Sequence, residues 1–232
     1  MSPTLKVDDM VFEVLPGTTR KTVELTVERD GQLTIRAPEG TDDAVLTGFV
    51  LEKRFWLYQK IALKQSMRKA VSAKEFVSGE GFPYLGRSYR LLLVDQQDVP
   101  LKLEAGRFRM PRAEAPNGRE VFIGWYTEHA LPWIRNRVRE YAPRMGVEPV
   151  RVEVRDLGFR WGSCGRAGTL NFNWATILLP PPIVEYVIVH ELVHLHEPNH
   201  TPEFWQRVER TLPDYERRKA WLAENGAGYV NL

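Results

Sequence analysis

The sequence predicts an α+β protein, and three observations support this fold class. The first third of the chain alternates apolar and polar residues in short runs, which is the pattern of half-buried strands. One long helical pattern interrupts these runs. The last third contains short strands beside a helix that is apolar nearly all round. We therefore expect a largely β N-terminal region with one long helix, residues 1–113, and a second region with a small sheet and several helices, residues 114–232.

The N-terminal region is expected to consist of short strands around one helix. Alternating residues and the turn signal Asp30-Gly31 predict the first strands, at residues 10–15, 22–28 and 33–35. A helix is predicted over residues 41–69, with Thr41 as its candidate N-cap and a basic side that fits a solvated face better than an anion site. Glycines then divide the chain into three further strands, at residues 75–77, 84–94 and 101–110.

The second region is expected to begin with a long helix over residues 120–144. Four arginines make one side of this helix basic: Arg135, Arg137, Arg139 and Arg144. Strands are predicted over residues 149–157 and 169–174. Prolines 180–182 then open the next helix, because proline is tolerated in a first helical turn. Two shorter helices follow, near residues 202–210 and 214–224.

Composition limits the possible classes of protein. The 232 residues, 43% of them hydrophobic, suffice for one large domain or two small ones. The formal net charge of +2 does not demand a nucleic-acid partner, and the one cysteine, Cys164, excludes an internal disulfide. The sequence shows no signal peptide and no run near the roughly 20 apolar residues of a membrane span. We therefore expect a cytoplasmic protein without a membrane partner, and the sequence indicates no oligomeric state.

The most specific pattern is H-E-x-x-H at residues 190–194, followed by a third histidine. In a helix, His190 and His194 lie one turn apart on one face, since each residue advances about 100°. Two neutral imidazoles so placed can bind Zn²⁺, with His200 as third ligand and a fourth position left for water. Glu191 can reach that water without binding the metal. The sequence thus predicts a hydrolase with one zinc ion per chain, most simply a peptidase.

Ordinary core histidines are the alternative interpretation of this pattern. Residues 183–189 are almost all apolar, so the helix is buried, and its histidines and glutamate are costly there unless a partner satisfies them. His196 lies about 200° around the helix from His194 and is expected to point away. The histidine spacing equals that of the metzincins, but Glu197 replaces their glycine and no Met-turn follows, so a true metzincin is not expected. Pro198-Asn199 is expected to end the helix.

A glycine-rich segment, residues 160–168, predicts a tight hairpin before the motif helix. The strand after it, residues 169–174, is expected to form a rim above the metal, where an extended peptide can pair with its edge. Turn and strand-end roles fit three polar residues better than substrate contacts do: Ser163, Asn171 and Asn173. Cys164 lacks a positioned base and is expected to be a buried thiol rather than a nucleophile.

Several motifs occur together in one order: WGSC, G-x-L-x-x-N-W, HELVHL, NHTPEFW and LPDY. With them, the chain from about Arg151 to Leu222 resembles the YgjP-like metallopeptidase family, relatives of the SprT-like zinc proteases, and the N-terminal part resembles it more loosely. The resemblance implies a zincin-like C-terminal domain in which three histidines bind zinc and one carboxylate is the base: His190, His194, His200 and Glu191. It also implies that a new helix starts near Thr201, with Phe204 and Trp205 packed behind the third ligand.

One detail and two other functions stay open at this stage. The group that stabilises the oxyanion is undecided between Tyr215, His196 and Arg160. Hydrolysis of nucleoside triphosphates is one alternative, with phosphates held by arginines at positions 135, 137, 139 and 160, although no P-loop or acidic Mg²⁺ cluster is present. A SprT-like module acting at DNA is the other, although no basic stripe interleaved with aromatic residues indicates nucleic-acid binding. The expected partner is a peptide or protein substrate.

Overall fold

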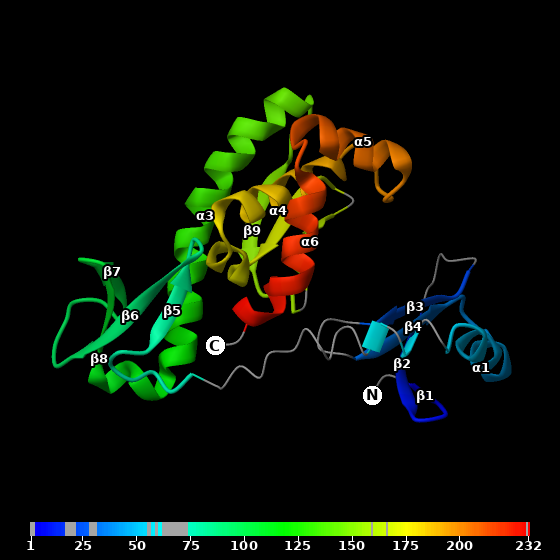
Figure 1. The fold of residues 1–232 in the computed structure, drawn as a ribbon, viewed down its shortest axis with the longest axis horizontal. Coiled ribbons are helices and arrows are strands. Elements are labelled where there is room, and N and C mark those ends of the chain that lie inside the picture. The colour runs from blue at the N-terminus through cyan, green and yellow to red at the C-terminus, as the bar shows by residue number, and fades with distance from the viewer. Residues whose placement is uncertain are drawn as a thin grey trace. The chain divides into compact units, whose positions relative to one another are not determined.

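The computed structural model describes residues 3–16, 22–27, 32–54, 57–58, 60–61, 74–158, 160–165, 167–230 and 232. It forms two compact units, Met1–Ala70 and Val71–Leu232, coloured blue to cyan and cyan to red in Figure 1. Both contain sheets and helices, so the predicted α+β class is confirmed. The domain boundary expected at residues 113/114 stays a prediction; the compact units divide at 70/71, because residues 74–113 share a core with the later helices.

The first unit contains a four-stranded sheet and helix α1 (Asp43–Glu52). Its strands are β1 (Thr4–Val7), β2 (Met10–Pro16), β3 (Glu24–Val27) and β4 (Leu33–Ala37), in the order β1-β2-β4-β3. β2 and β4 run parallel, and the other pairs are antiparallel. The strands around residues 10–15, 22–28 and 33–35 are confirmed, whereas the short β1 was not expected. Phe12 and Ile35 of this sheet pack against Leu46 of helix α1 (Asp43–Glu52) in a separate core.

The start of α1 differs from the sequence prediction. Asp42, not Thr41, is the N-cap, because its carboxylate accepts a hydrogen bond from the Ala44 N–H at 2.9 Å. The Thr41 hydroxyl instead donates to the Pro38 carbonyl. Residues 62–69 of the predicted helix and the Asp30-Gly31 turn lie outside the described residues.

The second unit begins with a sheet of order β5-β6-β8-β7, in which β6 and β8 run parallel. Its strands are β5 (Gly81–Tyr84), β6 (Arg87–Val94), β7 (Lys102–Glu104) and β8 (Arg107–Pro111), near the predicted positions. The strand expected at residues 75–77 is wrong. The Glu80 carboxylate accepts hydrogen bonds from the N–H groups of Glu75 and Phe76, so this backbone folds into a loop instead of a ladder.

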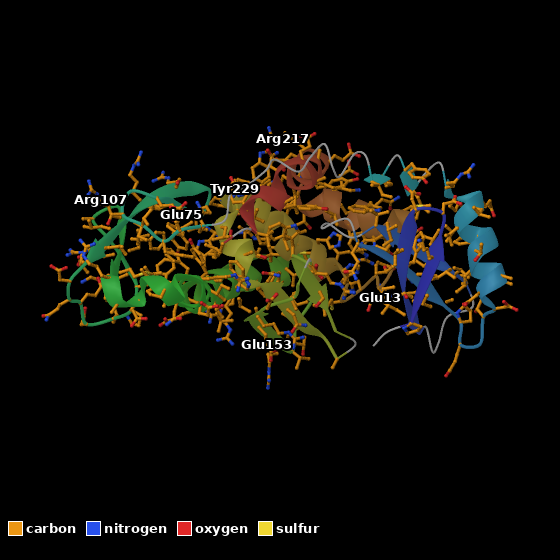
Figure 2. All side chains as sticks on the ribbon, turned by 90° about the horizontal axis from the view of Figure 1, so that it is seen from below. Glu13, Glu75, Arg107, Glu153, Arg217 and Tyr229 are labelled. Atoms are coloured by element: carbon orange, nitrogen blue, oxygen red, sulfur yellow. The ribbon has the colours of Figure 1, made fainter. Side chains whose placement is uncertain are left out.

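A 28-residue helix, α3 (Gly118–Met145), connects this sheet to the rest of the unit. A second sheet follows, with β9 (Arg151–Arg155), β10 (Gly162–Cys164) and β11 (Thr169–Asn173) in the order β10-β11-β9. β11 is therefore central, and the expectation that its edge is free for a peptide is wrong. The glycine hairpin folds β10 back onto β11, so β10 is the edge strand. Glu153 of β9 and Arg107 of β8, which lie on the two different sheets, are labelled in Figure 2.

Three helices complete the unit: α4 (Pro181–Val193), α5 (Pro202–Thr211) and α6 (Tyr215–Asn225). Short 3-10 helices lie at η1 (Arg112–Asn117), η2 (Trp174–Leu178) and η3 (Gly226–Tyr229). α4 packs against α3, α5, α6 and β10, which explains why it is apolar nearly all round, as predicted (Figure 1). None of the described helices is long and apolar enough to span a membrane.

Candidate metal centre

Three imidazoles converge at the end of α4. The ring centres of His190, His194 and His200 form a nearly equilateral triangle, with separations of 4.9 Å, 4.9 Å and 4.8 Å. One ring nitrogen from each lies within 4.8 Å of the other two. The Nε2 atoms of His190 and His200 are 3.0 Å apart. The structure thus brings together the three histidines that the sequence singled out.

Local helix geometry produces this convergence. α4 ends at Val193 with His194 at its C-cap, earlier than the Pro198-Asn199 end that the sequence predicted. The N–H of His196 bonds to the carbonyl three residues back, so the last turn tightens and leads the chain away. The chain returns at α5, where the Thr201 hydroxyl accepts from the Phe204 N–H at 3.4 Å, so the helix starts where it was expected. His200 is fixed directly before this cap.

Two aromatic side chains, Phe204 and Trp205, pack against the imidazoles. Phe204 is fully buried, and its ring contacts all three histidine rings. The distances between ring centres are 4.9 Å to His190, 4.7 Å to His194 and 4.7 Å to His200. Trp205 stacks on His200 at 5.7 Å. The expectation that these two residues pack against the third histidine is confirmed. Such packing fixes ring orientation, which a metal site needs.

The imidazoles are held in their neutral form. Burial lowers the pKa of all three imidazoles. The pKa of His190 falls to about 3, first because it is buried, and also because a proton there would be repelled by one on His194 or His200 and by the charge of Lys219. His194 Nδ1 donates to the Glu197 carbonyl at 3.0 Å, which leaves a lone pair on its Nε2. Neutral nitrogens whose lone pairs approach so closely repel one another unless they share a proton or a cation. This donor set therefore fits a metal ion.

Glu191 is the buried carboxyl of this site. Its side chain is 5% exposed, and burial raises its pKa to about 8, while the positive charge of Arg160 acts in the opposite direction. It lies directly under the edge strand. A Cβ added at Gly162 of β10 would meet the Glu191 Cγ and Oε1 at 2.7 Å. Only glycine at that position leaves room for this carboxyl.

Comparison with known proteins identifies the family. The model of the YgjP-like metallopeptidase domain matches residues 21–225. The chain belongs to the YgjP-like metallopeptidase family. As a YgjP-like protein it is a metallopeptidase, which requires a metal ion and acts on peptides or proteins.

The chain is also similar to part of a solved structure. The crystal structure of the metallopeptidase zymogen abylysin from Pyrococcus abyssi is similar over 38% of this chain and 86% of its own, at 25% sequence identity and a TM-score of 0.35. No curated protein matches the chain.

Some residues named from the sequence lie outside the histidine triangle of this YgjP-like chain. His196 is exposed, as expected, with Nε2 3.3 Å from the Met145 carbonyl oxygen. Asn173 has a structural role, since its amide donates to the Gly158 carbonyl and its oxygen accepts from the Ala175 N–H. Cys164 is only half-buried rather than buried. Burial and the charge of Glu191 both raise its pKa, so the thiol stays protonated.

A lysine near the site escaped the sequence analysis. The Lys219 ammonium of α6 lies 3.8 Å from the centre of the Trp205 ring, and its charge lowers the pKa of both His190 and His200. The ring of Tyr215 stacks on that of Trp205, with ring centres 5.6 Å apart. No local motif marks Lys219, because only the packing of α6 in the folded chain brings it near the histidines.

The arginines considered for phosphate binding have different partners. Arg137 pairs with Glu140 at 2.7 Å and with Glu185 at 3.7 Å. Arg135 donates to the Val152 carbonyl, and Arg139 donates to the Asn136 side chain. The charge of Arg160 acts on Glu191, whose pKa it lowers. These contacts give no support to a shared phosphate site.

Proposed function

We propose that this chain is a zinc-dependent metallopeptidase in which His190, His194 and His200 hold the ion and Glu191 is the general base. The observation that carries the proposal is the convergence of three neutral imidazoles beside one buried carboxyl. Three imidazole ligands are a donor set that zinc uses in catalytic sites, where a fourth position is left for water or substrate. Structural zinc sites, in contrast, are closed by four protein ligands, usually including cysteine.

The surroundings of Glu191 suit proton transfer. A bound zinc ion supplies Lewis acidity, which makes water acidic near pH 7 and polarises the scissile carbonyl. The positive charge of a cation held by the imidazoles would favour the carboxylate form of Glu191, which can then accept a proton from water. Because burial in an apolar pocket raises its pKa, the carboxyl can hold that proton near neutral pH until the more basic leaving amine accepts it. The charge of Arg160 acts on Glu191 and that of Lys219 acts on His190, so Lys219 joins Arg160 and Tyr215 as a candidate for stabilising the oxyanion.

We further propose that the substrate pairs with β10 instead of β11. The N–H of Gly165 bonds to the Thr169 carbonyl, and the N–H of Asn173 bonds to the Trp161 carbonyl. In an antiparallel ladder the hydrogen-bonded pairs alternate, so the backbone groups of Gly162 and Cys164 point outward from the sheet. An extended peptide bonded to them passes directly over Glu191, because Gly162 touches that carboxyl.

The test combines metal analysis with peptide cleavage. We expect about one zinc ion per chain in the wild type and in Glu191→Gln, and its loss when any of the three histidines becomes alanine. Glu191→Gln should lower kcat by roughly 10²–10⁴ on a peptide library. Glu209→Gln, an exposed change on α5, is the matched control and should keep full activity. Cleavage that survives Glu191→Gln or complete removal of metal contradicts the proposal. Phosphate release from nucleoside triphosphates without peptide cleavage would instead support the alternative hydrolase.

A further inference from the structure

A cavity lies between the β5–β8 sheet and the first half of α3. Its volume is about 840 Å³, within the range of ligand-binding pockets. The floor is apolar: Trp125 and His129 stack with ring centres 3.8 Å apart, and Leu101 and Leu103 lie beside them. His129 Nδ1 donates to the Trp125 carbonyl at 2.8 Å, which fixes the imidazole in this stack.

Three carboxylates surround this floor: Glu114, Glu120 and Glu128. Within the described part of the chain, none of them forms a hydrogen bond or an ion pair. The one lysine of the lining, Lys102, has acidic partners of its own, since its ammonium lies 3.6 Å from Glu104 and 3.8 Å from Asp98. The cavity therefore has an excess of negative charge over an apolar base.

Gly124 keeps the cavity open. It lies on α3 between Glu120 and Glu128, one turn from each, so all three share one face of the helix. A glycine inside a helix costs about 1 kcal/mol relative to alanine. No contact within the described residues requires it, because an added Cβ would meet nothing within 4 Å. The missing side chain leaves open space between the two carboxylates.

We propose that this cavity, lined by Glu120, Gly124, Glu128 and the Trp125–His129 stack, binds an arginine or lysine side chain of the polypeptide substrate. The aliphatic part of such a side chain covers the apolar floor, and its charged end reaches the unpaired carboxylates. This proposal depends on the proposed peptidase function in one respect: the bound polypeptide is taken to be the substrate. It makes the cavity a second anchoring site, apart from the metal centre.

The length of α3 sets the separation of the two sites. Glu128 and Met145 are 17 positions apart, which is roughly 25 Å along a helix. Met145 contacts His196, close to the end of the histidine motif. Figure 1 shows the β5–β8 sheet beside the start of α3, at the opposite end of the helix from Met145. At about 3.3 Å per extended residue, only a substrate longer than roughly 8 residues reaches both sites.

Binding is measured first, independently of catalysis. A short capped, dye-labelled peptide with two arginines is titrated into the Glu191→Gln protein, and its anisotropy is compared with that of a peptide carrying neutral citrulline. We expect the arginine peptide to bind at least about tenfold more tightly. Glu120→Gln with Glu128→Gln should weaken it about tenfold, whereas Glu148→Gln with Glu153→Gln, which removes the same charge elsewhere, should not. Gly124→Leu should abolish binding by filling the cavity, while thermal unfolding shows that the helix is intact.

Cleavage then separates this proposal from the proposed function. In a protein with an active Glu191, the cavity variants should raise KM about tenfold for a basic substrate of 15 or so residues and leave a neutral short peptide unaffected. Equal binding of the arginine and citrulline peptides, or unchanged binding by Gly124→Leu, overturns the cavity proposal even if the enzyme cleaves peptides. Peptide binding in the cavity without any cleavage overturns only the proposed function.

Discussion

Replacing Gly162 by alanine tests whether β10 and Glu191 act together. The new Cβ would lie 2.7 Å from the Glu191 Cγ and Oε1 and 2.9 Å from its Cδ, whereas ordinary contacts begin at 3.4 Å. The carboxyl must therefore move by about 0.7 Å, the difference between 3.4 Å and 2.7 Å. The strand cannot move as easily, because hydrogen bonds at Trp161 and Gly165 tie both its ends to β11.

The expected cost falls on catalysis more than on folding. A misplacement of about 1 Å in a catalytic group can lower the rate about 10²-fold, so we expect kcat to fall by roughly that factor. Overpacking of this size costs about 1–3 kcal/mol of the free energy of unfolding, which thermal denaturation measures. Bound zinc should stay near one ion per chain, since the Gly162 contact does not involve the histidines.

Gly165→Ala is the matched control, because it changes a glycine of the same hairpin. Its Cβ would have its nearest contact at 3.5 Å, with the Thr169 carbonyl oxygen, which is ordinary van der Waals distance. We expect kcat within about twofold of wild type, since surface changes of this kind cost little. Full activity of a folded Gly162→Ala protein, or equal losses in both variants, would refute the reasoning that β10 restricts the Glu191 carboxyl.

Three further predictions concern the same site. In metal-free protein, burial raises the pKa of Glu191 from 4.5 to about 8, so the folded state binds a proton that the unfolded state releases. The free energy of unfolding should therefore fall as pH rises from about 4.5 through 8, by up to about 5 kcal/mol. Chemical denaturation should show Glu191→Gln stabilising metal-free protein more at pH 8.5 than at pH 5; an equal effect at both contradicts the burial argument. Thr201→Ala removes an N-cap, so urea denaturation should show a loss of about 1 kcal/mol, and zinc titration should show weaker binding through His200, whereas Thr201→Ser should retain both. Phe204→Ala empties the space behind all three imidazoles and should cost about 3–5 kcal/mol together with most of the zinc affinity; tight zinc binding in that variant would disprove the supporting role.

The histidine triangle could be predicted from the sequence because its geometry is local. Helix periodicity alone puts His190 and His194 on one face, and the cap at Thr201 follows from residue type. The sequence predicts an end of α4 at Pro198-Asn199, later than the observed end at Val193, because a proline marks only where a helix can no longer continue. Here the tightened turn after Val193 ends it first.

Features that depend on distant pairing could not be predicted in this way. The alternation of residues 169–173 indicates a strand but not which strands flank it, so the sequence could not show that β11 is central rather than an edge. A strand was predicted at residues 75–77, yet the Glu80 carboxylate accepts hydrogen bonds from the N–H groups of Glu75 and Phe76. Lys219 reaches the site from α6 across Trp205, and no spacing in the sequence connects them.

The identity of the edge strand leads to a prediction about the substrate itself. Backbone groups point outward from β10 only at alternate residues, Gly162 and Cys164, while those of Ser163 face β11. A paired peptide must therefore offer every second N–H to the enzyme. In a series of peptides N-methylated one position at a time, away from the cleaved bond, KM should rise about tenfold at alternate positions and little between them, because each methyl group removes one donor. A flat profile would mean that the peptide does not lie along β10, and the metal centre would then receive its substrate through side-chain contacts instead.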